Sequence, residues 1–167
     1  SGYGVWDDSR NKLEEVFARC MGAEAALVRP QFMSGTHTLT VALFGLLRTG
    51  DTLLAATGRP YDTLEGVIGI GDAGKGCGTL REFGVNYDEC PLLPDFTPDY
   101  DLIAEKARTA TVVHIQRSRG YTQRNAFDLA TIQKVADTAR KANPNAVIFV
   151  DNCYGEFTQT AEPVAFG

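Results

Sequence analysis

The apolar run from Val147 to Val150, followed at once by Asp151, most constrains what this chain can fold into. Four apolar residues without polar alternation suit a strand buried on both faces, as in the middle of a parallel sheet covered by helices. Ligands of such sheets bind beyond the carboxyl ends of the strands, so we expect Asp151 at the rim of a pocket. The alternative is a carboxylate that only caps the following turn.

Strand and helix signals alternate along the rest of the chain. Strands are expected within residues 25–28, 51–55, 85–92, 111–116 and 147–150, and helices within residues 9–21, 34–46, 61–67, 102–108 and 129–139. The first of these helices carries a regular apolar stripe. The alternation predicts an α/β fold of three layers, with a mainly parallel sheet and helices on both faces.

Composition excludes several classes of protein. The 167 residues are enough for one domain with a core, and 44% of them are hydrophobic. The net charge is -5 and no basic run occurs, so nucleic acid is not an expected partner. No apolar stretch reaches the length of a membrane span, and the four cysteines form no C-x-x-C pair. We expect free thiols, no metal site and a cytoplasmic protein.

Both ends of the chain suggest a piece of a longer protein. Ser1 stands where an initiator Met is usual, and the chain stops at Gly167 soon after its last expected strand. Residues 1–167 are therefore interpreted as part of a larger domain.

Two segments are candidates for binding an anion and a flat ring. Residues 34–36, Ser-Gly-Thr, begin an expected helix, where free N–H groups and the helix dipole favour an anion such as phosphate. Tyr61 begins the next expected helix after a strand, so it emerges at the same rim and could lie against a flat ligand. A plain helix cap and a surface tyrosine are the respective alternatives.

A polar segment follows the expected strand at residues 111–116. Gln116, Arg117, Ser118 and Arg119 lie at or just past its carboxyl end. Two guanidinium groups there could hold a carboxylate or a phosphate through paired hydrogen bonds. Solvated loop arginines are the alternative.

Two other features are given no function. Residues 69–74 match the letters of the dinucleotide fingerprint, but they follow a helical stretch and continue into a glycine-rich loop to residue 78. The required strand before and helix after the glycines are missing. His37 is interpreted as a packed helix residue, and His114, in the middle of a strand, as a core residue.

Several long motifs resemble one family. Residues 23–32 with Ser-Gly-Thr-His at 34–37, Pro-Tyr-Asp-Thr-Leu-Glu at 60–65, Gln-Arg-Ser-Arg-Gly-Tyr at 116–121 and Val-Asp-Asn-Cys-Tyr-Gly-Glu-Phe at 150–157 are similar to the methionine gamma-lyase-like, or aluminium resistance protein, family. This family belongs to the fold type I pyridoxal phosphate enzymes, and the resemblance covers nearly the whole chain.

The resemblance implies a role for each candidate residue. Pyridoxal 5'-phosphate is expected with its phosphate at Ser34, Gly35 and Thr36, its ring against Tyr61 and its pyridine nitrogen on Asp151. A carboxylate at that nitrogen keeps it protonated, which strengthens the ring as an electron acceptor. The resemblance also places Gln116 at the cofactor and Arg117 and Arg119 near the substrate, makes Tyr61 a candidate acid, and directs Tyr3 to the cofactor phosphate of a neighbouring subunit.

The implied parent enzyme is a carbon-sulfur lyase that acts on sulfur-containing amino acids by elimination. It is expected to be a homodimer or homotetramer. The family's Schiff-base lysine lies beyond the Asp, in a stretch that this chain does not contain. None of the chain's lysines occupies an equivalent place: Lys12, Lys75, Lys106, Lys134 and Lys141. This chain, a partial large domain without the small C-terminal domain, is therefore expected to be inactive alone, and a noncatalytic phosphate-ligand or assembly domain remains the alternative.

Overall fold

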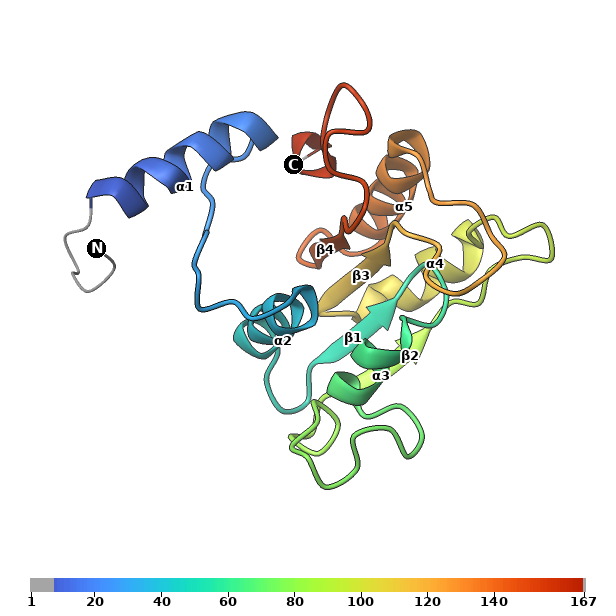
Figure 1. Ribbon diagram of the computed structural model, residues 1–167. Helices are drawn as coiled ribbons and strands as arrows, with labels where there is room; N and C mark the ends of the chain where they lie inside the picture. The colour runs from blue at the N-terminus through green and yellow to red at the C-terminus, as the bar shows by residue number, and fades with distance from the viewer. Residues whose placement is uncertain (1–7, 167) are drawn as a thin grey trace.

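The computed structural model describes residues 8–166 and contains a four-stranded parallel sheet (Figure 1). The strands are β1 (Thr52–Ala55), β2 (Asn86–Glu89), β3 (Val112–Gln116) and β4 (Val147–Asp151), in the spatial order β2-β1-β3-β4. In the register of the last pair, Gln116 lies opposite Asp151. All four carboxyl ends consequently lie at one edge of the sheet, which is where ligands bind in such folds.

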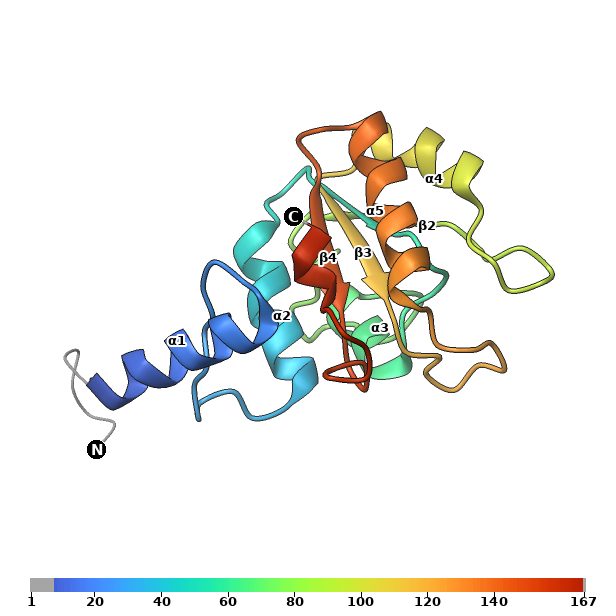
Figure 2. The ribbon, with the colours of Figure 1, turned by 90° about the horizontal axis from the view of Figure 1, so that it is seen from above.

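Helices cover both faces of the sheet, which confirms the three-layer α/β prediction. The helices on one face are α2 (Gly35–Leu46) and α3 (Asp62–Ile68), and those on the other are α4 (Tyr100–Lys106) and α5 (Leu129–Ala142). Figure 2 shows α2 and α5 on opposite sides of β3 and β4. Because side chains alternate along a strand, Val112 packs with the α2 and α3 core, whereas Val113 packs with the α4 and α5 core.

The position of β4 differs from the expectation of a fully buried central strand. In the part of the chain that the structure describes, β4 pairs only with β3 and forms an edge of the sheet. Val147 is 40% exposed, and residues 148–150 are only partly buried. An apolar run alone does not distinguish a central strand from an edge strand, because both bury at least one face.

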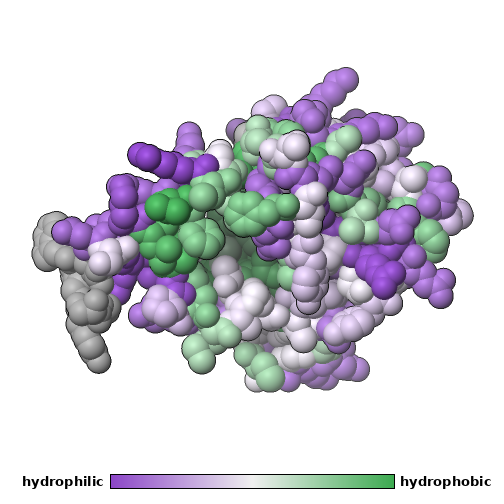
Figure 3. Space-filling model, turned by 45° about the horizontal axis from the view of Figure 1, so that its top comes forward, coloured by the Kyte–Doolittle hydropathy of each residue, from purple (hydrophilic) through white to green (hydrophobic). Residues whose placement is uncertain are grey.

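Two corrections concern the N-terminal third. Residues 25–28 form no strand, and Leu27 is 62% exposed. The helix α1 (Asp8–Met21) forms as expected, but its apolar stripe is largely exposed, with Phe17 at 40%. Figure 3 shows hydrophobic residues beside a hollow between this part of the chain and the main body. The pattern predicted the helix correctly but carries no information on what lies against it.

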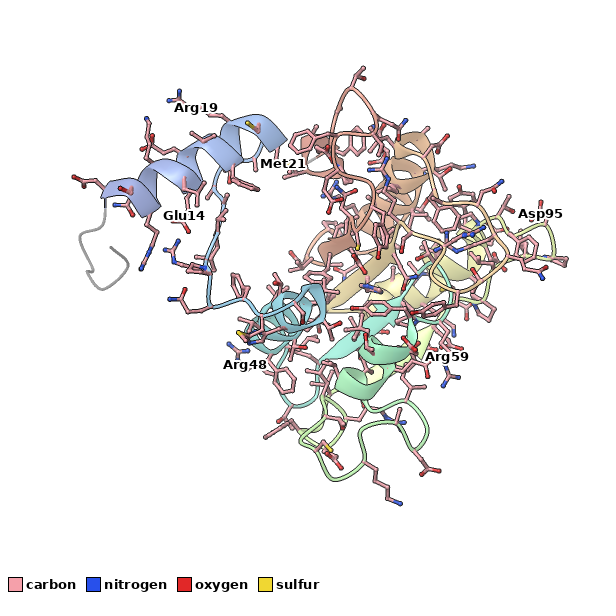
Figure 4. The ribbon with its side chains drawn as sticks, viewed as in Figure 1. Glu14, Arg19, Met21, Arg48, Arg59 and Asp95 are labelled. Atoms are coloured by element: carbon pink, nitrogen blue, oxygen red, sulfur yellow. The ribbon has the colours of Figure 1, made fainter. Side chains whose placement is uncertain are left out.

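A carboxylate connects α1 to the segment that follows it. Glu14 accepts a hydrogen bond from the Val28 N–H at 2.9 Å and forms an ion pair with Arg29. Figure 4 shows Glu14 on the side of α1 that faces this segment. The short linker is thus held by polar contacts rather than by strand pairing.

The glycine-rich loop after α3 is organised by its own carboxylate. Glu82 accepts hydrogen bonds from the N–H groups of Gly76, Gly78 and Thr79. These bonds lower the pKa of Glu82, with the Thr79 N–H first among the causes. The loop therefore already holds an internal anion and shows no helix start of the dinucleotide-binding kind.

The two histidines have opposite environments. His114 is buried, as expected, and neither ring nitrogen has a hydrogen-bond partner within the described chain. Its ring centroid lies 5.9 Å from that of Phe149. His37 is exposed rather than packed, and its Nδ1 accepts a hydrogen bond from the Met33 N–H.

We predict that His114 makes the protein sensitive to mild acid. Burial lowers the pKa of His114 from 6.5 to about 4, so the folded state stays neutral where the unfolded state binds a proton. The free energy of unfolding therefore falls as the pH decreases from about 6.5 towards 4. His114→Leu should raise stability at pH 7 by about 1–3 kcal/mol, because two unsatisfied polar atoms are removed. It should also flatten this pH dependence.

Urea denaturation at several pH values between 4 and 7 measures both effects. His37→Gln is the matched control, since that imidazole is exposed, and it should leave the slope intact. An unchanged slope in His114→Leu would contradict the assignment.

Candidate functional site

A cavity of about 650 Å³ opens at the carboxyl edge of the sheet and is called here the edge cavity. Its walls come from the starts of α2 and α3 and from the segments that follow β3 and β4. The lining residues include Ser34, Gly35, Thr36, Leu39, Tyr61, Asp62, Thr63, Ser118, Gly120, Tyr121, Val150, Asp151, Asn152, Cys153, Tyr154 and Glu156. The cavity thus brings together the expected anion site, the expected ring contact and the strand-end carboxylate.

The N-terminus of α2 supplies free N–H groups to this cavity. The Ser34 hydroxyl caps the helix by accepting from the His37 N–H at 3.1 Å. The first backbone bond of the helix runs from the Thr38 N–H to the Ser34 carbonyl. The amides of Gly35 and Thr36 precede that bond and have no acceptor within the described residues, so they remain available to an anion. The Ser34 cap therefore forms as the alternative expected, and it leaves the first two amides of the helix unused.

Three hydroxyl groups continue from this helix start. Thr36 Oγ1 shares hydrogen bonds with the Tyr61 hydroxyl and with Thr63 Oγ1, each at 3.0 Å. Thr63 was not identified from the sequence, although it lies two residues after Tyr61 at a helix start. The cluster fixes the Tyr61 ring beside the α2 N-terminus.

Gln116 does not line the edge cavity but lies buried behind Tyr61, which it positions. Its Oε1 accepts from the Tyr61 N–H at 2.9 Å, and its Nε2 donates to the Ser118 carbonyl at 3.2 Å. The side chain is buried, with 5% exposure. These contacts hold two walls of the cavity together, and the contact of Gln116 with a cofactor stays a prediction.

Asp151 is buried at the floor of the edge cavity. Its side chain shares a sheet face with Gln116 because the two residues are paired in register. Its Oδ1 accepts from the Cys153 N–H at 3.1 Å, whereas Oδ2 has no partner within the described chain. The turn-capping alternative is thus realised by one oxygen, and the other is available to a ligand.

Burial and neighbouring carboxylates determine the charge state of this floor. The pKa of Asp151 is raised above its ordinary value, mainly by burial and further by Glu156. The pKa of Cys153 is also raised, first by burial and then by Asp151 and Glu156. A cationic group bound against Asp151 would offset the desolvation of the carboxylate.

Arg117, expected near the substrate, is bound by the protein itself. Its guanidinium is buried, and each of its five N–H donors has an acceptor within the protein. The acceptors are the Phe127 carbonyl, Asn152 Oδ1, the Gly155 carbonyl, Thr158 Oγ1 and Gln159 Oε1. Arg117 therefore anchors the segment after β4 and has no donor left for a substrate.

Sequence reasoning did not identify the remaining anchors of this segment. Asn152 donates to Glu162 at 2.8 Å, so it links that carboxylate to Arg117. Arg124 is buried beneath the neighbouring loop, and its guanidinium lies 4.1 Å from the centre of the Phe127 ring. Arg119, in contrast, is exposed and does not line the edge cavity.

Some expectations concern residues outside residues 8–166 or groups that are absent from the described part of the chain. Tyr3 lies outside residues 8–166, so its proposed contact with a neighbouring subunit is not described. No lysine lines the edge cavity. Within the described part of the chain, no three His, Cys, Asp or Glu side chains gather to hold a metal ion, and no helix is long and apolar enough to cross a membrane.

The fold and site define an α/β domain in which the N-terminus of a helix and a buried carboxylate line one cavity at the carboxyl edge of a parallel sheet. The profile of the methionine gamma-lyase family matches residues 1–167. The chain therefore belongs to this family, which agrees with the resemblance found in its motifs.

The chain is also similar to individual known proteins. It is 45% identical over 168 residues to the uncharacterized protein YnbB of Bacillus subtilis. It is also 45% identical to the crystal structure of a carbon-sulfur lyase involved in aluminum resistance from Clostridium novyi, with a TM-score of 0.93. All of this chain is matched in both cases, but only 40% of each relative. A methionine gamma lyase from Micromonospora echinospora, 22% identical, shares the fold with a TM-score of 0.68, over 99% of this chain and 38% of its own.

We predict that Asp151→Asn stabilises the ligand-free protein. The raised pKa means that the folded state favours the protonated carboxyl. The stability that Asp151 contributes at low pH is therefore lost as the pH rises above about 3.9, the pKa of the unfolded state. The neutral amide avoids this loss. Thermal melting should give a higher Tm for Asp151→Asn at pH 7, with a smaller difference near pH 4.5. A lower Tm at pH 7 would contradict a desolvated carboxylate.

We predict that Arg117→Met destabilises the protein by about 3 kcal/mol. Several buried acceptors lose a charged donor, and hydrogen bonds to charged groups contribute about 1.5–3 kcal/mol each without being additive. Arg119→Gln is the matched control and should change stability by less than about 0.5 kcal/mol. Denaturant midpoints compare the two variants. Equal effects would show that Arg117 is not an anchor.

Proposed function

We propose that the edge cavity binds pyridoxal 5'-phosphate and that the natural protein carrying this chain is a carbon-sulfur lyase acting on sulfur-containing amino acids. The observation that carries the proposal is the convergence of a buried carboxylate, an aromatic ring and free helix amides in one cavity. Membership of the methionine gamma-lyase family supports it. So does the carbon-sulfur lyase from Clostridium novyi that shares 45% of its residues with this chain.

The ring nitrogen of the cofactor would meet Asp151. A buried carboxylate with one unpaired oxygen and a raised pKa is a poor arrangement for an empty protein. A protonated pyridine nitrogen supplies both the missing donor and the missing positive charge. The donor set at the cavity floor therefore fits this cofactor.

The phosphate would lie at the start of α2. The amides of Gly35 and Thr36 are free donors there, and the helix dipole adds favourable potential for an anion. The hydroxyls of Thr36 and Thr63 stand beside them, 3.0 Å apart. The Tyr61 ring, held by Gln116 from behind, would lie against the pyridine ring.

When bound, this cofactor supplies an electron-accepting ring that stabilises the negative charge left at the α-carbon of an amino acid. The chain's own residues orient that ring and control its charge. Cleavage of the carbon-sulfur bond leaves the electron pair on sulfur, which takes up a proton and departs as a thiol. The Tyr61 hydroxyl, already in a hydrogen bond with Thr36, is the candidate proton donor.

Residues outside this chain complete the proposed enzyme. The chain spans about 40% of the length of the relatives it matches, and no lysine lines its edge cavity. The Schiff-base lysine is therefore proposed to come from the remaining part of the natural protein. A homo-oligomeric assembly, with Tyr3 reaching the phosphate of a neighbouring subunit, belongs to the same proposal.

Absorbance spectroscopy of the natural protein tests the proposal. Added pyridoxal 5'-phosphate should give a visible band that borohydride shifts, and thiol should be released from S-substituted cysteines. Asp151→Ala should lower thiol release by more than about 100-fold, since loss of one partner of a buried charged pair costs about 2–5 kcal/mol.

Two other results would count against the proposal. Undiminished turnover in Asp151→Ala would remove the proposed role of the carboxylate. A protein that binds the cofactor but releases no thiol would favour a noncatalytic phosphate-ligand or assembly domain.

A further inference from the structure

A second cavity, of about 510 Å³, adjoins the edge cavity and is called here the side cavity. Both cavities are lined by Ser118, Gly120, Cys153 and Tyr154, so they share a wall. The other residues of the side cavity are Arg117, Arg119, Ala126, Phe127, Gly155 and Thr158. A molecule bound in the edge cavity could therefore extend past this wall into the second one.

The two cavities differ in charge. The edge cavity is lined by Asp62, Asp151 and Glu156 and by no arginine or lysine. The side cavity is lined by Arg117 and Arg119 and by no acidic residue. A ligand that spans both is therefore favoured when its far end is anionic.

The two arginines that line the side cavity have no direct counterion among the described residues. Neither Arg117 nor Arg119 forms an ion pair with a carboxylate within 4.0 Å there. Buried charges without a counterion are costly, and a bound anion nearby would offset part of that cost.

Arg119 is the guanidinium that can reach such an anion. The five donors of Arg117 are all used inside the protein. The side chain of Arg119 is exposed and makes no hydrogen bond or ion pair with the described residues. Its planar group presents donors suited to both oxygens of a carboxylate.

Tyr154 lies at the boundary between the two cavities and has a strained backbone conformation. Its φ is 65°, in the left-handed region that side chains other than glycine rarely adopt. The residue is 87% exposed and lines both cavities. Such strain concentrates at ligand sites, where neighbouring structure maintains it.

We propose that the side cavity receives the part of the substrate beyond its sulfur atom, and that Arg119 selects a carboxylate there. The inference rests on the proposed function, because it assigns the amino-acid end of the substrate to the edge cavity. It defines the substrate class as L-amino acids whose sulfur carries a short chain that ends in an acidic group. Arg119 is then a specificity-determining residue and Arg117 a structural one.

A pair of isosteric substrates tests this assignment in the natural protein loaded with cofactor. S-(2-carboxyethyl)-L-cysteine and S-(2-carbamoylethyl)-L-cysteine differ in the charge of the terminal group. The ratio of their kcat/KM values should favour the carboxylate by about tenfold, which is the effect of one partly exposed ion pair of about 1.4 kcal/mol. Arg119→Gln should bring the ratio close to one. Arg108→Gln, an exposed arginine away from both cavities, should leave the ratio and the rates unchanged.

A binding measurement keeps the inference separate from catalysis. Calorimetry on cofactor-free protein should show that 3-(methylthio)propanoate binds more tightly than 3-(methylthio)propanamide, and that Arg119→Gln removes the difference. If both cysteine derivatives are inert while this difference is present, the proposed lyase activity fails and the anion subsite stands.

Other outcomes would overturn the subsite. They are equal kcat/KM values for the two derivatives in the unmodified protein, or equal binding of the two propanoic compounds. A loss of cofactor affinity in Arg119→Gln would assign this guanidinium to the cofactor phosphate instead, and would overturn the substrate role as well.

Discussion

The parallel register of β3 and β4 is the constraint on which the candidate site depends. It places Gln116 and Asp151 side by side on one face and at one edge of the sheet. Because α2 runs antiparallel to the following β1, its N-terminus returns to the same edge, and α3 begins there directly after β1. The free amides, the hydroxyl cluster and the carboxylate therefore meet although they are far apart in sequence. A shift of one residue in the register would turn Asp151 towards α5 and separate it from Tyr61.

Three buried polar side chains connect the segments around the candidate site, and each forms a different kind of hydrogen bond. Gln116 connects the start of α3 to the segment after β3 through neutral hydrogen bonds. Arg117 uses a full set of charged donors to fix the segment after β4. Asp151 is satisfied only in part, and its burial raises its pKa. Both polar atoms of the Gln116 amide and every donor of Arg117 have a partner inside the protein, whereas one oxygen of Asp151 has none among the described residues and retains capacity for a ligand.

Much of the fold could be predicted from the sequence because local patterns determine it. The alternation of strands and helices, the helix starts at Ser34 and Tyr61, and the strand that ends at Asp151 all follow from periodicity and capping chemistry. The failures concern what packs against an element. The exposed stripe of α1, the unpaired segment at residues 25–28 and the edge position of β4 depend on contacts between distant parts of the chain, which hydrophobic pattern does not encode.

For the candidate site too, the sequence predicts some features and not others. Strand-end position correctly predicted that Asp151, Tyr61 and residues 34–36 lie together. It did not distinguish an arginine whose donors are all used inside the protein from one whose side chain is exposed. Arg117 and Arg119 are two residues apart, yet the side chain of Arg117 is buried with all its donors used, whereas that of Arg119 is exposed and has no partner among the described residues. Only the conformation of the segment at residues 152–159 decides this, because it supplies four of the five acceptors of Arg117.

In the proposed holoenzyme, Asp151 holds a proton on the ring nitrogen of pyridoxal 5'-phosphate. Nitrogen-15 NMR of the natural protein with ring-labelled pyridoxal 5'-phosphate measures this directly. We expect the chemical shift of a protonated pyridine nitrogen at neutral pH, and a change to the unprotonated value in Asp151→Asn. An unprotonated nitrogen in the unmodified protein, or a shift that the substitution does not alter, would contradict it.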